Sequence, residues 1–548
     1  TYDGEGRLSS ITDVMGLTSG FEYDGDFVTK LTTPYGETRF AMEAAGIDRW
    51  IETTDALGGK ERVEFRNYTS GLPSEPAAPA GFSNAYVGYR NTFVWDKRAM
   101  DEYPGDYSKA QILHWLHTVD QARAGGTLEG EKKPQESRVY YSYPGQMRSY
   151  DEGTGTQPTA AGRLLDGNVA QVRRFEHNQR GMKVREIDPV GRETAYVYGT
   201  NGVPDPDPVN GSGLDLLQVK QKNAASPGGW DLLGSYSYNA NHQVLTATDA
   251  AGQTTTYTYT PTGQVETVTN AKNETTSYAY DTEGRLHTVT GPVGGTTTTY
   301  EYDGYGRLWR VTDPEGYATT TEYDLFDRPT KVTYPDGTWE ETQYEKLDAV
   351  RRRDRLGRWT ETFYDALRRP VATRDAAGRV VQQQFCNCGG AVEKLVDANG
   401  NATSWDRDIQ GRVITETRAN GATYSYEYAT RTSRQTSVTD PKGNVKTNTY
   451  NADDTLAGIT YAVAAGTAPT PNVSFTYDPA YNRVKTMTDG TGTTTYTYHP
   501  ITDPPALGAG KLESVDGPLA DDTIEYGYDE LGRVTTRQIG SAANTQTQ

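Results

Sequence analysis

The stretch of sequence that decides the fold is residues 280–323, YDTEGRLHTVTGPVGGTTTTYEYDGYGRLWRVTDPEGYATTTEY. It contains two kinds of turn signal, Tyr-Asp-x-x-Gly-Arg at 280–285 and Asp-Pro-x-Gly at 313–316, and both place Asp and Gly where a backbone reverses direction. Between them, runs such as 307–312 and 317–323 alternate large and polar residues with a period of two, which is typical of β-strands. One repeat is therefore predicted to be one β-hairpin.

The same unit recurs along most of the chain, marked by an aromatic residue every 20 to 22 positions, with longer gaps where loops are inserted. A lone hairpin is marginal in water, so successive hairpins are expected to pair edge to edge in a sheet that twists and curls. We therefore expect an all-β fold in which repeated β-hairpins form one continuous spiralling sheet. The marker residues are Tyr238, Tyr259, Tyr280, Tyr302, Tyr323, Tyr344, Tyr364, Phe385, Trp405, Tyr428, Tyr450, Tyr477, Tyr498 and Tyr528.

The motif residues are expected to be structural. A Tyr at the same point of every hairpin would form a ladder with its neighbours, and the Arg of the motif would bring a guanidinium within reach of those rings. The structural residues that we single out are Tyr2, Asp3, Gly6, Arg7, Tyr280, Asp281, Gly284, Arg285, Tyr302, Asp303, Gly306, Arg307, Tyr323, Asp324, Tyr364, Asp365, Tyr528, Asp529, Gly532 and Arg533.

The composition predicts a thin wall without a thick dry core. Only 34% of the 548 residues are hydrophobic, and 39 Tyr against 11 Phe supply much of the aromatic content. A Tyr ring is apolar but its hydroxyl needs water or a partner, which suits a layer that is wet on at least one side.

The net charge of -19 argues against a nucleic-acid partner, because phosphate binding needs clustered Lys and Arg. Two Cys cannot form a disulfide framework, and no apolar stretch is long enough to span a membrane.

The repeated Tyr-Asp-x-x-Gly-Arg-Leu with intervening Asp-Pro-x-Gly resembles the Rhs/YD-repeat family, and good copies stand at 2–8, 280–286, 302–308 and 528–533. The resemblance implies a spiral β-sheet closed into a hollow, cocoon-like shell, as in bacterial Rhs effectors, the encapsulating subunits of Tc toxins and animal teneurins. In the toxin members such a shell sequesters a C-terminal toxic domain. The Asp-Pro-rich signature of a self-cleaving segment is not recognisable in this sequence, so autoproteolysis is not assigned.

The periodicity divides the chain into repeat segments at 1–65 and 163–548 and a non-repeat insertion at 66–162, packed on or plugging the wall. Within the insertion we predict one helix, near 108–123. Ser108-Lys-Ala-Gln111 is typical of a capping box, and Gly125-Gly126 would end the helix. Its hydrophobic face would be Ile112, Trp115, Leu116 and Val119.

Metal binding has three weak candidates. On the predicted helix His114 and His117 would lie side by side, with Asp101, Glu102, Asp106 or Asp120 nearby; the alternative is ordinary, partly buried His. Cys386 and Cys388 are half a zinc site, with a local disulfide or a free-thiol turn as alternatives. The loop 203–215 could offer oxygens to calcium, or it is a plain extended loop. We expect no cofactor and assign no catalytic residue, since no nucleotide-loop, metalloprotease or serine-hydrolase motif is present.

Three functions are weighed. The first is a structural shell that encloses or presents a polypeptide, its own C-terminal or otherwise enclosed segment, such as a toxin. The second is a secreted or cell-surface adhesion scaffold whose Trp230, Trp309 and Trp339 bind surface glycans or other proteins. The third is a hydrolytic or metal enzyme in the 66–162 insertion. We favour the first, with no nucleic-acid partner and no membrane span, and we expect a bacterial protein that is longer at both ends and exported to the cell surface or secreted.

Overall fold

The structure, a computed structural model, describes residues 1–118, 123–200, 202–386, 389–466, 468–540 and 545–547. This part of the chain forms one sheet of 45 strands, with one α-helix and three short 3₁₀ turns. The expected all-β fold of repeated hairpins is confirmed. No described helix is long and apolar enough to cross a membrane.

The first sixteen strands are β1 (Ser10–Thr12), β2 (Thr18–Asp24), β3 (Phe27–Thr33), β4 (Gly36–Ala45), β5 (Asp48–Thr54), β6 (Lys60–Tyr68), β7 (Tyr89–Trp95), β8 (Gln111–His117), β9 (Ala124–Lys132), β10 (Val139–Ser142), β11 (Ala160–Leu164), β12 (Ala170–His177), β13 (Lys183–Ile187), β14 (Glu193–Thr200), β15 (Val203–Pro204) and β16 (Asp215–Lys222). The helix α1 is Lys97–Glu102, and the 3₁₀ turns are η1 (Tyr107–Lys109), η2 (Asp166–Asn168) and η3 (Pro227–Gly229).

The next fourteen strands are β17 (Trp230–Tyr238), β18 (Val244–Asp249), β19 (Thr254–Tyr259), β20 (Val265–Thr269), β21 (Thr275–Tyr280), β22 (Leu286–Thr290), β23 (Thr297–Tyr302), β24 (Leu308–Thr312), β25 (Ala318–Tyr323), β26 (Pro329–Thr333), β27 (Trp339–Glu345), β28 (Asp348–Arg353), β29 (Trp359–Tyr364) and β30 (Pro370–Arg374).

The last fifteen strands are β31 (Val380–Phe385), β32 (Val392–Val396), β33 (Ala402–Arg407), β34 (Val413–Thr417), β35 (Thr423–Tyr428), β36 (Gln435–Thr439), β37 (Val445–Tyr450), β38 (Leu456–Ala462), β39 (Val473–Tyr477), β40 (Val484–Asp489), β41 (Gly492–Tyr498), β42 (Leu512–Asp516), β43 (Ile524–Tyr528), β44 (Val534–Ile539) and β45 (Thr545–Thr547).

The connectivity is the simplest one possible for so many strands. Each strand pairs antiparallel with the next along the chain, for example β22 with β23 through Thr288↔Thr299, and the short β15 is an extra partner of β14 beside β16. The sheet is not closed: in the described residues β1 pairs only with β2, and β45 only with β44. Continuous pairing satisfies the ladder hydrogen bonds of every hairpin except at these two ends.

An aspartate carboxylate organises the turn at the Tyr-Asp end of many hairpins, and Asn, Thr or another residue replaces it in the others. In the β25–β26 turn, Oδ1 of Asp324 accepts the backbone N–H groups of Phe326 (2.8 Å) and Arg328 (3.1 Å), while Oδ2 accepts Nε of Arg328 (2.7 Å). Burial alone would raise the pKa of Asp324, but the bonds from Arg328 outweigh it and hold the pKa below the ordinary range. The fourth turn residue is left-handed, and Asp327 adopts this conformation (φ 60°) where most copies have Gly, such as Gly306 (φ 82°).

A β-bulge precedes the marker aromatic of nearly every repeat. The register shifts between Glu301 and Tyr302, between Glu322 and Tyr323, and at the equivalent position of the other copies. A bulge increases the local twist and bends the strand that carries it. Since the bulge recurs at the same place in successive hairpins of the regular repeats, the bends add in one sense, and the sheet curls.

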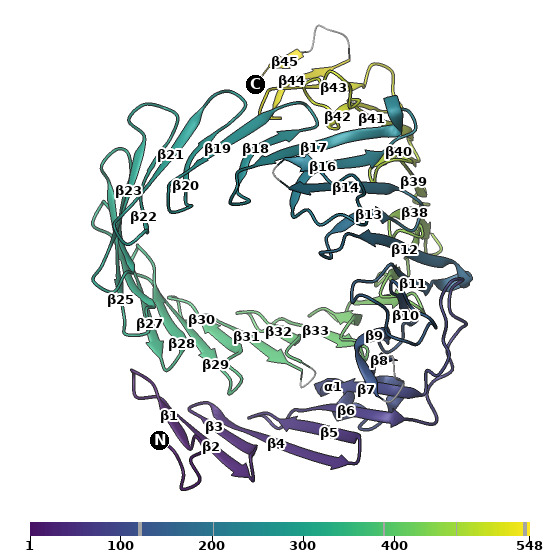
Figure 1. Ribbon diagram of the computed structural model, residues 1–548. Coiled ribbons are helices and arrows are strands. Elements are labelled where there is room, and N and C mark those ends of the chain that lie inside the picture. Colours follow the sequence, from purple (N-terminus) through teal and green to yellow (C-terminus); the bar gives the residue numbers. More distant parts are fainter. Residues whose placement is uncertain (119–122, 201, 387–388, 467, 541–544, 548) are drawn as a thin grey trace.

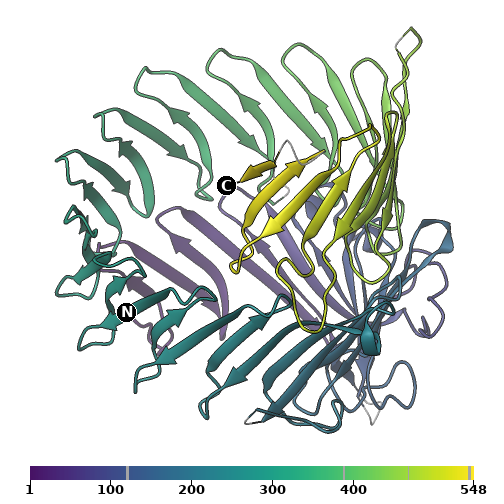
Figure 2. The same cartoon turned by 90° about the horizontal axis from the view of Figure 1, so that it is seen from above.

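The curled sheet winds around a central axis. In Figure 1, β1–β6 lie at the bottom, β7–β17 rise on the right, β18–β27 pass over the top and down the left, and β28–β33 return above β1–β6. From there β34–β43 rise again beside the first circuit. Figure 2 shows the two circuits next to each other, with the yellow C-terminal strands beside the teal ones. In Figure 1 no described helix or strand crosses the central region.

The two circuits are joined along a seam of turn-to-turn contacts between residues 250 to 312 positions apart. The turns that meet are of opposite kinds: Asp-Pro-x-Gly-type turns of the first circuit, such as 188–191, face Tyr-Asp-type turns of the second, such as 451–454. The seam contacts are Tyr35–Leu347, Lys346–Pro34, Arg98–Asp408, Gln410–Pro134, Ser137–Arg431, Thr430–Asp166, Gln171–Asp454, Arg192–Asp453, Gln221–Ala480, Tyr481–Asp231 and Lys272–Asp529.

The seam contains buried ionic contacts. The Arg192 guanidinium binds both Asp188 of its own turn (2.5 Å) and Asp453 of the second circuit, and the side chains of Arg192 and Asp453 are only 7% and 5% exposed. Burial alone would raise the pKa of Asp453, but hydrogen bonds from Thr455 and the charge of Arg192 hold it below the ordinary range. Nearby, the Tyr481 hydroxyl donates to Asp231, and burial together with this carboxylate raises the pKa of Tyr481.

The helix predicted near 108–123 is wrong. Residues 107–109 form the 3₁₀ turn η1, capped by Asp106, and 111–117 form strand β8. Hydrophobic residues on both sides of β8 gave it the spacing of a helix, but pairing with β7 and β9 decides its structure. Val119 lies outside the described residues. The helix of this region is instead α1, capped by Asp96.

The 66–162 segment continues the wall, because β7 to β11 pair in the same sheet as their neighbours. Within the described residues one hydrophobic core cluster forms, where α1 packs on β7 and β8 and meets Ile409 of the second circuit. Its buried members are Phe93, Trp95, Ala99, Met100, Ala110, Ile112 and Ile409.

We predict that replacing Asp324 by Ala lowers the free energy of opening the β25–β26 hairpin by about 1–2 kcal/mol, because buried N–H groups lose their acceptor. Hydrogen–deuterium exchange at the Phe326 and Arg328 amides measures the effect as a rise in exchange rate. Asp324→Asn keeps the acceptor oxygen and is the matched control, with a smaller effect. Equal exchange in both variants and the wild type would contradict the role of the carboxylate.

We predict that the seam weakens in acid. A depressed pKa in the folded state means that Asp453 contributes stability above about pH 4, the ordinary carboxylate value, and that this stability is lost as the pH falls further. Asp453→Asn should cost about 1–3 kcal/mol at pH 7, less than an isolated buried pair because Arg192 keeps Asp188. Hydrogen–deuterium exchange of the 188–192 amides should be measured from pH 7 down to pH 3. As the pH falls, the protection of these amides in the wild type should drop to the protection seen in Asp453→Asn. A difference between the two that does not change with pH would rule out this ion pair as the cause.

Candidate functional site

The wall itself is the candidate functional element, and a ladder of side chains ties its hairpins together. Each marker Tyr donates its hydroxyl to a carbonyl of the preceding hairpin, as Tyr302 does to Leu286 (2.9 Å). The Arg of the preceding motif lies over the ring, with Arg285 4.7 Å from the centroid of Tyr302. The same hydroxyl bond is made by Tyr23, Tyr238, Tyr259, Tyr280, Tyr323, Tyr344, Tyr364, Tyr428, Tyr450, Tyr477, Tyr498 and Tyr528.

A second polar assembly is buried within the 66–162 segment. Nη2 of Arg90 lies 3.3 Å from Oε2 of Glu129, and the same oxygen is 3.0 Å from Nε2 of His114. Asn91 Oδ1 lies 3.0 Å from Nδ1 of His114. All four side chains are at most 3% exposed. Burial lowers the pKa of both His114 and Arg90, although Glu129 opposes the shift in each case. The cluster therefore carries one cation and one carboxylate that offset each other beside a neutral imidazole.

The two histidines singled out in the sequence do not form a pair. On strand β8 the register shifts on either side of Trp115, and His114 is buried whereas His117 is half-buried. His117 instead lies 2.6 Å from Nη1 of Arg90 through Nε2. Of the nearby acids, Asp101 and Glu102 belong to α1, and Asp120 lies outside the described residues. In the described part of the chain, no group of three or more His, Cys, Asp or Glu could hold a metal ion.

The other two metal candidates lie far from this cluster. Cys386 is buried at the end of β31 and is disulfide-bonded, whereas Cys388 lies outside the described residues. In the 203–215 loop, Asp205 accepts the Gly213 N–H (2.8 Å) and Asp207 caps the turn that follows it. These carboxylates bind the backbone of their own loop.

The exposed tryptophans of the adhesion alternative lie on separate strands. Trp230 begins β17, Trp309 lies in β24 and Trp339 begins β27. Trp309 is 37% and Trp339 36% exposed, and an Arg353 guanidinium lies 3.9 Å over the Trp339 ring. The structure does not bring these three rings together into one sugar-binding surface.

The seam was missed by sequence reasoning. Its residues lie in the same turns that the repeat predicts, and nothing in a single repeat distinguishes a turn that contacts the other circuit from one that does not. A weak signal exists in hindsight: several seam turns of the first circuit depart from Asp-Pro-x-Gly, as do 134–137 and 166–168.

One family model matches parts of the sequence. The RHS Repeat family model matches residues 2–38, 238–276, 280–308, 306–338 and 410–445. The matches lie in the regular repeats and leave out 66–162. Curated proteins give no significant match to the sequence.

Solved structures share the fold over the whole chain. The "TcdB2-TccC3-TEV" crystal structure superposes with a TM-score of 0.65 at 13% identity, covering 100% of this chain and 35% of that one. The crystal structure of TcdB2-TccC3 without its hypervariable C-terminal region has a TM-score of 0.64 at 13% identity. The match covers 100% of this chain and 34% of that one. The structure of the Photorhabdus luminescens Tc holotoxin pore with a TccC3 mutation has a TM-score of 0.61 at 13% identity. The match covers 100% of this chain and 34% of that one. This chain thus spans about a third of the length of those chains. The five matched segments show that this chain contains RHS repeats, and the solved structures show that its fold is similar to theirs.

Proposed function

We propose that this chain is a section of the wall of a hollow shell that encloses or presents a polypeptide. The observation that carries the proposal is the seam: one sheet winds past its own beginning and joins rim to rim, so that it surrounds a central region instead of lying flat. A wall whose described residues form one small hydrophobic cluster is suited to this role, because it encloses space without filling it.

The similar structures support the proposal. Two of them contain TcdB2 and TccC3, one of these lacks a hypervariable C-terminal region, and the third is a Tc holotoxin pore with a TccC3 mutation. By analogy, the enclosed partner of this chain would be a polypeptide linked to the shell, such as a toxin or effector segment, and the whole protein would be exported from the cell. The role we assign is that of a non-catalytic scaffold, in which the repeat residues and the seam hold the wall together.

Two measurements on the longest natural polypeptide containing this chain test the proposal. Cryo-electron microscopy should show walls that close around internal density unassigned to the repeats. Limited proteolysis should show that the enclosed segment is protected, and that protection falls several-fold when the seam is weakened by Asp453→Asn with Tyr481→Phe. Asp336→Asn, in an exposed turn away from the seam, is the matched control.

An open or solid wall without internal density would refute the enclosure role. In that case the adhesion scaffold would become the favoured function, with the exposed Trp309 and Trp339 as its binding residues. Protection that is identical in the seam double variant and the control would show that the seam does not close the shell.

A further inference from the structure

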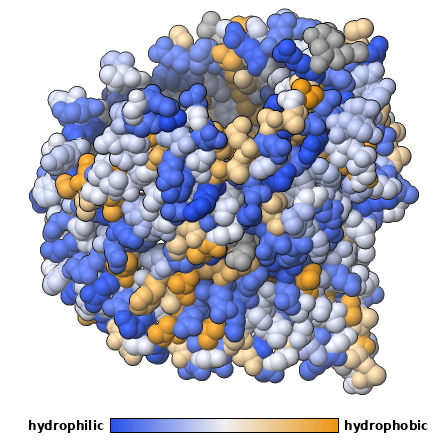
Figure 3. Space-filling model, turned by 90° about the horizontal axis from the view of Figure 1, so that it is seen from below, coloured by the Kyte–Doolittle hydropathy of each residue, from blue (hydrophilic) through white to orange (hydrophobic). Residues whose placement is uncertain are grey.

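One face of β4, β5 and β6 carries a row of exposed hydrophobic side chains. The strand register places Met42 opposite Ile51 and Ile51 opposite Val63, and the three side chains are 52%, 40% and 41% exposed. These strands lie at the bottom of Figure 1, and Figure 3, seen from below, shows several hydrophobic residues (orange) gathered on that side. A row of this kind on a largely polar wall marks an interaction surface.

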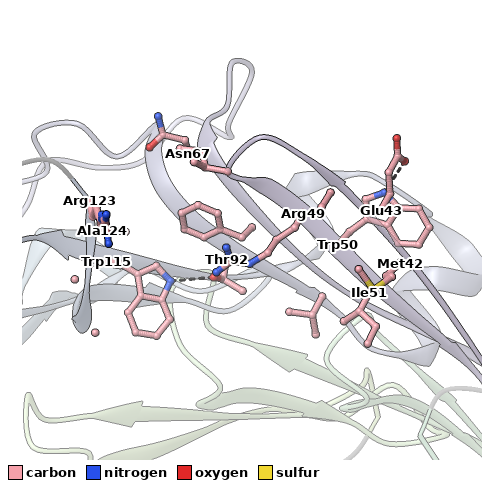
Figure 4. A pocket seen from close by; sticks show the side chains of 16 residues that line it. Met42, Glu43, Arg49, Trp50, Ile51, Asn67, Thr92, Trp115, Arg123 and Ala124 are labelled. Atoms are coloured by element: carbon pink, nitrogen blue, oxygen red, sulfur yellow. Dashed lines mark hydrogen bonds between the residues drawn. The ribbon is translucent and has the colours of Figure 1, made fainter. Parts of the chain in front are cut away.

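The row forms the floor of a groove. A cavity of about 790 Å³ extends from Met42, Ile51 and Val63 to Phe65 and Trp115. In Figure 4, Met42, Ile51 and Trp115 extend from the same side of the sheet, whereas Glu43 points away. Trp115 is held in place because its Nε1 donates to Thr92 Oγ1 at 2.9 Å.

A second cavity continues the first. It has a volume of about 440 Å³, is walled by the rings of Tyr86, Tyr89 and Tyr150, and shares Asn67, Arg123 and Ala124 with the first. Tyr86 lies edge-on to Tyr150, with ring centroids 5.1 Å apart, and adopts a left-handed backbone (φ 62°). Such a conformation is costly for a bulky residue and is retained where the surrounding structure requires it. We call the two cavities together the β4–β8 groove.

The charges of the β4–β8 groove are opposite to those of the protein as a whole. The chain has a net charge of -19, yet Arg49 and Arg123 line the groove, and neither has an ion pair among the described residues. The carboxylates at its edge are engaged: Glu43 accepts from Trp50 Nε1 at 3.1 Å, Asp48 from the Asn67 N–H and Glu152 from the Gly126 N–H. The groove is therefore an apolar floor beside two guanidiniums without an ion pair in the described residues, which attract anions.

We propose that the β4–β8 groove binds an extended peptide segment in which apolar and acidic residues alternate. In an extended peptide, successive side chains point to opposite sides, so apolar ones can lie on the Met42–Val63 row while carboxylates reach Arg49 and Arg123. Charge complementarity favours an acidic segment over a basic one. The assignment is independent of enclosure: the sheet is not closed, so a short peptide reaches either face of the wall.

Fluorescence anisotropy with labelled octapeptides tests this assignment on the full chain. An octapeptide of alternating Leu and Asp should bind, while one of alternating Leu and Lys and one of alternating Ser and Asp should bind at least tenfold more weakly. The double variant Arg49→Glu, Arg123→Glu should lower the affinity for the Leu/Asp peptide at least tenfold and raise the affinity for the Leu/Lys peptide. Val63→Asp should lower the affinity for the Leu/Asp peptide without raising the affinity for the Leu/Lys peptide.

Arg352→Glu is the matched control, since Arg352 is an exposed strand arginine of β28 without an ion pair in the described part of the chain. It should leave binding of all three peptides unchanged, and circular dichroism should show that each variant keeps the β-fold. Equal binding of the acidic and basic peptides, or acidic-peptide binding untouched by the double variant, would overturn the proposal. So would a concentration-dependent dimer that Val63→Asp abolishes, because a second copy would then be the occupant.

Discussion

The carboxylate in the Tyr-Asp turn is the interaction on which the rest of the structure depends. One aspartate satisfies two backbone N–H groups of its turn and also holds the Arg that completes the motif, as Asp281 does with Glu283 and Arg285. The fixed guanidinium then lies over the ring of the next marker aromatic. A wall whose described residues form one small hydrophobic cluster cannot rely on a large dry core, so hydrogen bonds and cation–π contacts repeated along the sheet supply its order.

The curvature follows from the same unit. A bulge recurs beside nearly every marker aromatic, so successive hairpins of the regular repeats bend the sheet in the same sense, and the bends add until the chain passes its own beginning. The rims that meet there are chemically different, since one carries Asp-Pro-x-Gly-type turns and the other Tyr-Asp-type turns. This difference lets arginines and carboxylates of opposite rims pair, as Arg192 and Asp453 do.

The repeated part of the fold could be predicted from the sequence because turn chemistry and period-two alternation are local signals. The 66–162 segment could not, since the spacing of Ile112, Trp115 and Leu116 fits a helix as well as a strand with two hydrophobic sides. Pairing of Asn91 with His114 and of Trp115 with Leu128 decided in favour of the strand, and it separated His114 from His117. The seam and the β4–β8 groove were out of reach for a different reason: their residues meet only once the curvature per hairpin and the register between strands are known.

The central claim is that the sheet returns to join its own first circuit, and a zero-length carbodiimide crosslink tests it most directly. Lys272 Nζ lies 3.0 Å from Asp529 and 3.5 Å from Glu530 across the seam. Mass spectrometry of the monomeric protein should find Lys272 joined to one of these residues. The Lys60–Glu52 pair of neighbouring strands, 2.9 Å apart, is the internal control. Recovery of the control crosslink without the Lys272 crosslink would mean that the wall does not meet itself, and the shell account would be wrong.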